Sequence, residues 1–226
     1  MSAQIPKLAR LQPANAPELS LPLVAYGAGT ALYRRDIAKE VQTAAQAGHR
    51  FFDLAEMYQN TGSAGNGLRA FLSSGDSTVS RNDLTILTKI ADGQIHAYKT
   101  LQEEIAALNL SSSSTDSPAF DIVLSHYPPR ANAAKARPSN VQVWRELERA
   151  VDDGLTRTIG VSNWLAPDIE EVYSAEGGVK HPIAFNQIEF HPLLASTPQY
   201  KELLPLCREK GITIMTYSAL VPLTRK

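Results

Sequence analysis

The chain has 226 residues, of which 43% are hydrophobic and 20% are charged, the composition of a globular protein with a sizeable core. Its net charge of −1 leaves no basic field that would attract nucleic acid. The single cysteine, Cys207, excludes an internal disulfide framework and a cysteine-based zinc site, and we expect no metal site. The sequence has neither a membrane-spanning apolar run nor the apolar core of a signal peptide, so we expect a cytoplasmic protein that does not bind membranes.

Short apolar runs alternate with segments of helical periodicity along the chain. Runs rich in β-branched and aromatic residues predict buried parallel strands at 23–26, 50–54, 84–88, 120–124, 157–161, 183–187 and 212–216. Apolar residues on one helical face predict helices at 36–47, 97–108, 141–151, 167–173 and 199–210. Prolines before residue 23 predict an irregular or hairpin lead-in, and the serine-rich segment 111–117 predicts an exposed loop.

The predicted strands begin at intervals of roughly 30 residues, the length of a βα unit. An unbroken series of such units favours a (β/α)8 TIM-barrel fold in one domain covering residues 1–226. Seven units reach the end of the chain. We therefore expect the eighth unit, together with phosphate-binding loops near the end of the barrel, to be missing, as in a truncated form of a longer protein.

Polar residues stand where the predicted strands end. In (β/α) barrels these carboxyl ends meet at one mouth, where the chemistry takes place. The residues at these positions are Asp53, Lys89, His126, Ser162, Asn163, Gln187, Tyr217 and Ser218. One polar strand end can simply mark the point where a strand reaches solvent, but a lysine, a histidine and a carboxylate together favour an active site with mutually perturbed pKa values.

Several segments carry a family resemblance. They are GHRFFDLAEMY (48–58), LTK (87–89), SHYP (125–128), IGVSN (159–163), NQIEFHP (186–192) and TYS (216–218). In order and position these segments resemble the aldo-keto reductases, most closely the fungal branch that acts on small carbonyl compounds. The resemblance implies an oxidoreductase that reduces aldehydes and ketones to alcohols with NADP(H), on a small-molecule carbonyl substrate.

The resemblance also implies a catalytic tetrad of Tyr58, Asp53, Lys89 and His126. Carbonyl reduction needs a hydride on carbon and a proton on oxygen. A phenol is a poor acid at neutral pH, but a nearby ammonium favours its ionised form and strengthens it as a proton donor. Lys89, held by Asp53, would supply that charge to Tyr58, while His126 would orient the substrate oxygen.

For the cofactor, the resemblance implies two groups of residues. Ser162, Asn163 and Gln187 match the positions that hold the nicotinamide carboxamide, and Tyr217, followed by Ser218, matches the ring on which the nicotinamide stacks. Gly29 and Thr30 match the end of the first strand, where the backbone approaches the ligand. The segment is not a Rossmann fingerprint, because Leu32 stands at the third glycine position.

Two features qualify these predictions. After Tyr58 the family carries an Asn-Glu pair that leads into a helix, whereas the glycine-rich segment 59–67 predicts a loose loop beside the substrate pocket, which leaves the substrate size open. Arg130, Lys135 and Arg137 follow the fourth predicted strand and would suit an anionic substrate, but a solvated loop is the preferred interpretation. The natural substrate, NADP against NAD, and the oligomeric state also stay open.

Two other functions compete with a reductase. One is a non-catalytic barrel fragment that serves as a binding or regulatory protein. The other is an isomerase or aldolase that uses Lys89 as a Schiff-base amine, which neither the Asp53–Tyr58 spacing nor the Ser162–Asn163 pair supports.

Overall fold

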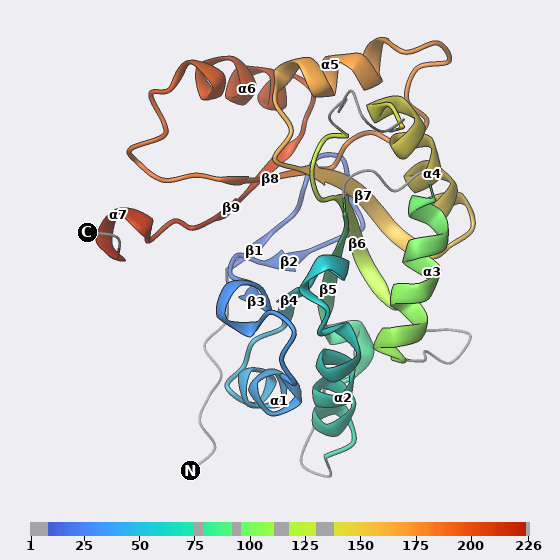
Figure 1. Ribbon diagram of the computed structural model, residues 1–226, viewed down its shortest axis with the longest axis vertical. Helices are drawn as coiled ribbons and strands as arrows, with labels where there is room; N and C mark the ends of the chain where they lie inside the picture. Colours follow the sequence, from blue (N-terminus) through green and yellow to red (C-terminus); the bar gives the residue numbers. More distant parts are fainter. Residues whose placement is uncertain (1–8, 75–78, 92–95, 111–117, 130–137, 225–226) are drawn as a thin grey trace.

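A curled parallel sheet organises the protein (Figure 1). The computed structural model describes residues 9–74, 79–91, 96–110, 118–129 and 138–224, so the predicted loop at 111–117 lies outside the described residues. The sheet has seven strands paired in chain order: β3 (Tyr26–Gly27), β4 (Phe51–Asp53), β5 (Thr85–Ile90), β6 (Phe120–Ser125), β7 (Thr156–Ser162), β8 (Phe185–Glu189) and β9 (Thr213–Tyr217). The predicted α/β fold with parallel strands is confirmed, as a half-barrel.

Helices pack on the outer face of this sheet (Figure 1). They are α1 (Ala38–Gln46), α2 (Thr61–Leu72), α3 (Ala97–Leu108), α4 (Asn140–Asp152), α5 (Ala166–Ser174) and α6 (Pro198–Glu209), with the short α7 (Val221–Thr224) after β9. Ser139 caps α4, since its hydroxyl accepts a hydrogen bond from the Gln142 amide at 3.1 Å. Gly211, at φ 70°, follows α6 in the left-handed conformation that ends helices, as the sequence predicts.

The glycine-rich segment after Tyr58 is helical, so the predicted loose loop is wrong. Helix α2 begins at Thr61 and contains Gly62, Gly65 and Gly67. A Cβ atom at Gly65 would lie 1.9 Å from the Leu108 carbonyl oxygen of α3, and one at Gly67 would lie 2.3 Å from the Ala38 carbonyl oxygen of α1. These glycines therefore serve close packing of α2 against its neighbouring helices rather than flexibility, a reason that the local sequence does not contain.

The lead-in forms a hairpin that covers the inner face of the half-barrel. Its strands β1 (Arg10–Leu11) and β2 (Leu21–Pro22) pair antiparallel, which confirms the predicted hairpin. Leu19 and Leu21 join a core cluster with Leu87 and Phe185 of the sheet. Asn15 donates hydrogen bonds to the carbonyls before β8 and β9, at 2.9 and 3.0 Å. The hairpin is thereby held at the amino ends of the strands, and the opposite end of the sheet is left for a pocket.

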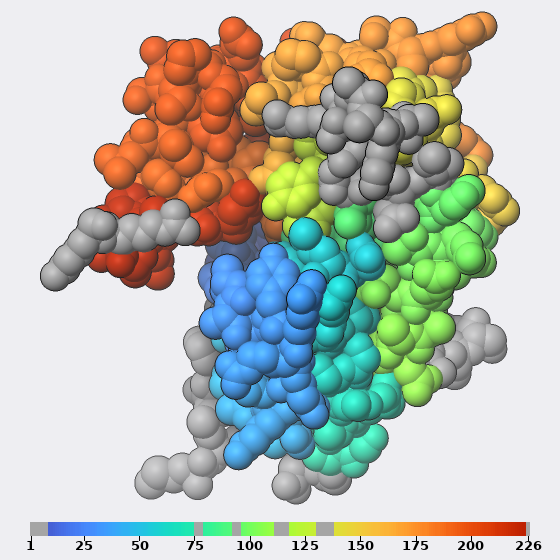
Figure 2. Space-filling view, in the orientation of Figure 1, coloured from blue at the N-terminus to red at the C-terminus, as the bar shows by residue number. Residues whose placement is uncertain are grey.

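The two edges of the sheet are β3 and β9, and no strand pairing among the described residues joins them. A groove of about 490 Å³ lies between the hairpin side and β9, lined in part by Leu21, Val24 and Met215. Figure 2 shows a notch between the blue N-terminal elements and the red C-terminal ones. Among the described helices, none combines the length and hydropathy that a membrane span requires.

Candidate active site

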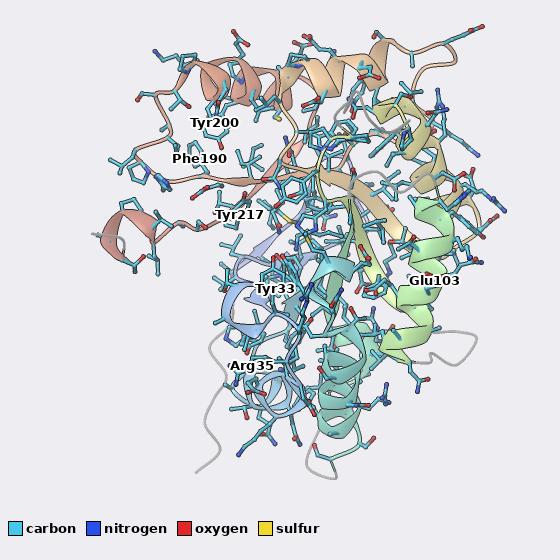
Figure 3. The ribbon with its side chains drawn as sticks, viewed as in Figure 1. Tyr33, Arg35, Glu103, Phe190, Tyr200 and Tyr217 are labelled. Carbon is cyan, nitrogen blue, oxygen red and sulfur yellow. The ribbon has the colours of Figure 1, made fainter. Side chains whose placement is uncertain are left out.

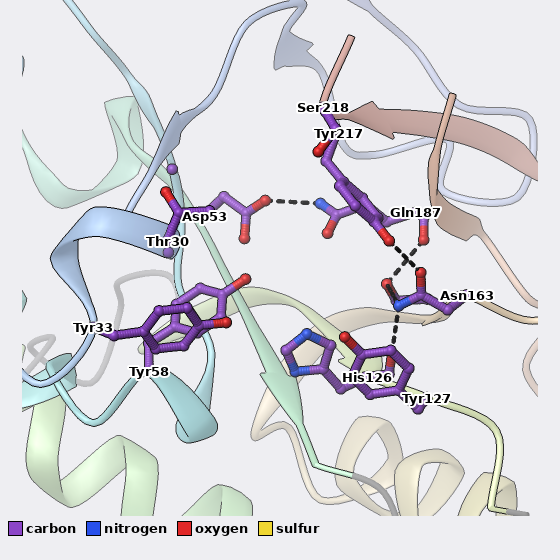
Figure 4. Close-up of a pocket in the computed structure, with 13 residues that line it drawn as sticks. Thr30, Tyr33, Asp53, Tyr58, His126, Tyr127, Asn163, Gln187, Tyr217 and Ser218 are labelled. Atoms are coloured by element: carbon purple, nitrogen blue, oxygen red, sulfur yellow. Dashed lines mark hydrogen bonds between the residues drawn. The ribbon is translucent and has the colours of Figure 1, made fainter. Parts of the chain in front are cut away.

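A pocket of about 250 Å³ opens at the carboxyl ends of the strands (Figure 4). Its lining residues come from loops and strand ends far apart in sequence: Gly27, Gly29, Thr30, Tyr33, Asp53, Tyr58, His126, Tyr127, Ser162, Asn163, Gln187, Tyr217 and Ser218. Every residue predicted for the site therefore lines this pocket except Lys89. The Lys89 side chain lies beneath the pocket, with only 1% of its surface exposed.

Lys89 connects the carboxylate of the site to its phenol. Its Nζ atom forms an ion pair with Asp53 and donates hydrogen bonds to the Tyr58 hydroxyl at 3.2 Å and to the Leu54 carbonyl oxygen at 3.0 Å. The other oxygen of Asp53 accepts a hydrogen bond from Gln187 Nε2 at 2.7 Å. A buried ammonium thus has a carboxylate, a carbonyl and a phenol as partners, which satisfies its three donors.

Tyr58 reaches Lys89 from a one-turn 3-10 helix, η2 (Glu56–Tyr58), which directly follows β4 and ends at Gln59 with φ 53°. Burial raises the pKa of Tyr58, and the negative charge of Asp53 raises it further. The sequence predicts that the nearby ammonium favours the ionised phenol, but Asp53 compensates the charge of Lys89, so burial decides the direction of the pKa shift. The phenol of the free site is therefore protonated at neutral pH.

His126 follows β6 and is 5% exposed. Burial lowers its pKa to about 3, with the charge of Lys89 as the second cause, so the imidazole is neutral at physiological pH. Its ring meets the Tyr58 ring edge-on at 5.8 Å and stacks on Tyr127 at 4.8 Å. A neutral ring held beside the phenol can donate a hydrogen bond to a substrate oxygen, but it is a poor source of protons.

The opposite wall is a chain of polar side chains (Figure 4). The Tyr217 hydroxyl donates to Asn163 Oδ1 at 2.6 Å, and Asn163 Nδ2 donates to the His126 carbonyl oxygen at 2.9 Å. The Ser162 hydroxyl donates to the Gln187 carbonyl oxygen at 2.8 Å. Asn163 holds φ 63°, a backbone conformation that asparagine tolerates better than most residues. These bonds orient hydroxyl and amide groups at the pocket wall.

At the end of the first parallel strand, the backbone itself forms part of the pocket. A Cβ atom at Gly29 would lie 3.1 Å from Cζ of Tyr58, so any larger residue there would crowd the phenol. Thr30 takes φ 54° as the chain turns into the 3-10 helix η1 (Thr30–Leu32). Glycine at position 29 is therefore explained by its close approach to Tyr58.

Sequence reasoning missed two aromatic lining residues, Tyr33 and Tyr127. Tyr127 could have been found, because it directly follows His126 at a strand end. Tyr33 lies past η1, and no periodicity or spacing places it in the pocket. Arg130, Lys135 and Arg137 lie outside the described residues.

The chain belongs to the aldo/keto reductase family, since the sequence model of that family matches residues 24–222. This match covers most of the chain and all of the parallel strands, and it confirms the family resemblance of the sequence segments. The chain is therefore a member of an oxidoreductase family built on the (β/α) barrel.

Several characterised relatives are similar over most of the chain. An NAD/NADP-dependent indole-3-acetaldehyde reductase of Schizosaccharomyces pombe is 32% identical over 91% of this chain and 68% of its own length. A glycerol 2-dehydrogenase (NADP(+)) of Saccharomyces cerevisiae is 28% identical over 82% of this chain and 61% of its own. A crystal structure of a Bombyx mori aldo-keto reductase in complex with NADP superposes with a TM-score of 0.74 and 27% identity, over 93% of this chain and 66% of that one. The chain thus spans roughly three fifths to two thirds of their lengths.

Proposed function

We propose that this protein reduces aldehydes and ketones to alcohols with NADPH, and that Tyr58 donates the proton. The observation that carries the proposal is the contact of a buried ammonium, Lys89, with both Asp53 and the Tyr58 hydroxyl at the floor of a pocket. Family membership and the NADP named for its relatives support the same reaction.

The polar wall suits a nicotinamide. Ser162, Asn163 and Gln187 present hydroxyl and amide groups, which can both donate to and accept from a carboxamide. Tyr217 offers an aromatic ring beside them, while Gly29, Thr30 and Ser218 line the pocket where the backbone can approach the cofactor. When bound, NADPH would supply the hydride. We propose NADP(H) as the cofactor, in line with the names of the relatives.

In the proposed reaction the substrate oxygen lies between Tyr58 and His126. The neutral His126 ring donates a hydrogen bond that orients the oxygen and polarises the carbonyl. As the carbonyl carbon accepts the hydride, negative charge develops on the oxygen, and the Tyr58 hydroxyl transfers its proton there. The resulting phenolate is 3.2 Å from Lys89 Nζ in the free geometry, so the ammonium stabilises the charge that forms only during the reaction.

The test is a cofactor titration followed by turnover. Binding of NADPH and of NADH is measured by quenching of the fluorescence of Trp144 and Trp164, both of which are buried, and turnover is measured by loss of NADPH absorbance with a simple aldehyde. Saturable binding with aldehyde-dependent oxidation of NADPH supports the proposal. Binding without turnover would contradict the reductase and favour a binding protein, and the absence of binding would contradict both.

A further inference from the structure

Tyr33 occupies an unusual place in the pocket. It lines the cavity, yet 42% of its side chain is exposed, so it contributes less to the core than a packing aromatic would. Its ring meets the Tyr58 ring edge-on, with centroids 4.9 Å apart and planes at 88°. Figure 4 shows the two rings next to each other on one side of the pocket. An exposed ring against the proposed proton donor is placed to touch whatever Tyr58 acts on.

The loop that carries Tyr33 is held in one conformation. The Arg34 amide donates to the Tyr58 carbonyl oxygen at 2.9 Å, just after Tyr33. The buried Asn60 side chain donates to the carbonyl oxygens of Ala28 and Leu32, both at 2.9 Å. The loop is therefore tied on both sides of Tyr33 to the turn that carries Tyr58. The backbone on both sides of the ring is fixed and the ring packs edge-on against Tyr58, which lowers the conformational entropy that contact with a ligand costs.

The other rings and charges of the pocket restrict what can enter. His126 and Tyr127 are stacked with their planes 8° apart, and the His126 ring lies next to the Tyr58 ring (Figure 4). Among the described lining residues the only carboxylate is Asp53, which Lys89 and Gln187 already engage. The same residues include no cationic side chain that would receive a carboxylate or phosphate group of a substrate. The described part of the pocket therefore offers aromatic rings, which favour a flat molecule, and no cationic partner for a charged one.

From this geometry we infer that Tyr33 is a specificity-determining residue, and that its ring selects small aromatic aldehydes over saturated ones of similar size. The inference rests on the proposed reductase function and adds a substrate class to it. Aromatic rings gain from edge-to-face or offset contact beyond the apolar area they bury, whereas a puckered saturated ring gains only from burial. The preference arises in the contact with Tyr33 and therefore acts on substrate binding.

The test compares benzaldehyde with cyclohexanecarbaldehyde, which share a ring size and an aldehyde group. Tyr33→Leu removes the aromatic face but keeps an apolar side chain, and Tyr33→Phe keeps the face. We expect Tyr33→Leu to lower the benzaldehyde to cyclohexanecarbaldehyde ratio of kcat/KM by about two- to tenfold, mainly through KM, and Tyr33→Phe to leave it unchanged. Since the ratio is compared between variants, the different intrinsic reactivities of the two aldehydes cancel.

Tyr98 provides the matched control. It lies on α3, donates to Asp153 at 2.7 Å and lies outside the pocket, so Tyr98→Leu should leave the ratio unaltered. An equal loss of kcat for both aldehydes in Tyr33→Leu would show that Tyr33 acts only by supporting Tyr58, and it would overturn the inference. A wild-type ratio that Tyr33→Leu does not change would overturn it as well, while leaving the reductase function intact.

Binding of unreactive amides separates the inference from the proposed function. Benzamide and cyclohexanecarboxamide are titrated into the wild type and Tyr33→Leu by calorimetry in the presence of NADP. If the wild type binds benzamide more tightly than cyclohexanecarboxamide and Tyr33→Leu loses this difference, the role of Tyr33 is supported even when no aldehyde is turned over. The lack of turnover would then contradict only the proposed reductase function. Equal binding of both amides by the wild type would overturn the role of Tyr33.

Discussion

Two buried ion pairs lie at opposite ends of the same sheet. Arg81 and Asp121, 2.8 Å apart, are at the amino ends of β5 and β6, with 7% and 1% of their side chains exposed. Lys89 and Asp53 are at the carboxyl ends of β5 and β4, with 1% and 16% exposed. Burial and charge hardly distinguish the two pairs, but most of their remaining hydrogen-bond partners differ in kind.

The pair at the amino ends is completed mostly by backbone, with the Arg157 guanidinium 3.6 Å from the second oxygen of Asp121. Arg81 donates to the carbonyl oxygens of Leu84 and Pro118 at 2.9 and 2.7 Å, and the Ile86 amide donates to Asp121 at 2.8 Å. Such contacts tie the segments that lead into two strands to each other. Removing Asp121 would leave Arg81 as an uncompensated buried charge, so this pair supports the fold.

The pair at the carboxyl ends is completed largely by side chains that face the pocket. Lys89 donates to the Tyr58 hydroxyl, and Asp53 accepts from Gln187. A buried ion pair therefore does not by itself identify an active site. The partners decide its role, because side chains at a cavity can respond to a ligand and strand backbone cannot.

The largest expected effect comes from removing the Tyr58 hydroxyl, the pocket partner of the Lys89–Asp53 pair. Tyr58→Phe keeps the ring against Tyr33 but removes the proton donor and the partner of Lys89. We expect the rate of aldehyde reduction to fall by about 10²- to 10⁴-fold, with the Kd of NADPH nearly unchanged. Steady-state kinetics and fluorescence titration measure the two quantities. A fully active variant would show that the proton comes from elsewhere.

The next effect separates the two carboxylates. Asp121→Ala should lower the free energy of unfolding by about 3–5 kcal/mol, since Arg81 stays buried without its counter-ion, while kcat of the folded protein is kept. Asp53→Asn also leaves a buried cation, Lys89, without its counter-ion and should lower the free energy of unfolding, but unlike Asp121→Ala it should lower kcat as well, because Lys89 contacts the Tyr58 hydroxyl. Urea unfolding and kinetics on both variants measure the contrast. Equal effects of the two substitutions on kcat would remove the distinction between the pairs.

A smaller effect concerns His126, the neutral neighbour of the Lys89 pair. Its pKa is about 3 in the folded protein and near 6.5 in an unfolded chain, so the unfolded state binds the extra proton as the pH falls. The stability from the neutral ring is complete above about pH 6.5 and is lost toward pH 3. His126→Gln should flatten the fall of the unfolding free energy between pH 7 and 5. As the control, His181→Gln replaces a more exposed histidine and should leave this pH dependence unchanged. If His126→Gln does not change the pH dependence of the unfolding free energy, the lowered pKa of His126 is contradicted.

The smallest effect concerns a buried carboxylate that has a hydroxyl partner instead of a cation. Glu104 accepts a hydrogen bond from Thr61 at 2.7 Å, and burial raises its pKa. The stability from its neutral form is present below the unfolded pKa and is lost as the pH rises through the folded one. Glu104→Gln should raise Tm at pH 7 by no more than about 3 °C and have little effect near pH 4. Glu103→Gln, at an exposed position labelled in Figure 3, should change neither value; equal shifts in both variants would contradict the prediction.

Most of the regular structure could be predicted from local patterns. Helix α3 matches the predicted span of 97–108, and strand β6 begins at Phe120 as predicted. Hydrophobic periodicity and the polar residues at strand ends predict these elements, because both depend only on residues that are close in the sequence. The boundaries are less well predicted, as shown by β3, which begins at Tyr26 rather than at residue 23.

Packing between distant segments explains where prediction failed. In helix α2, Gly65 and Gly67 approach the carbonyl oxygens of other helices, so a larger side chain would not fit. Local helix propensity takes no account of such contacts, and a glycine-rich segment therefore predicts a loop. Contacts among aromatic side chains also join segments whose packing local patterns do not predict. Phe190 and Tyr200 meet with centroids 5.6 Å apart and Tyr200 donates to the Glu189 carbonyl oxygen, so α6 is fastened to the end of β8 (Figure 3).

The sequence by itself determined the alternation of strands and helices, the family, and the polar strand ends from which the pocket is built. These properties follow from periodicity and from motifs that can be seen along the chain. Only the tertiary structure decided that Tyr33 enters the pocket, that Asp53 compensates the charge of Lys89, and that burial governs the pKa of Tyr58 and His126. The reason is physical: solvation and charge–charge energies depend on distances between atoms, and folding brings together residues that the sequence separates.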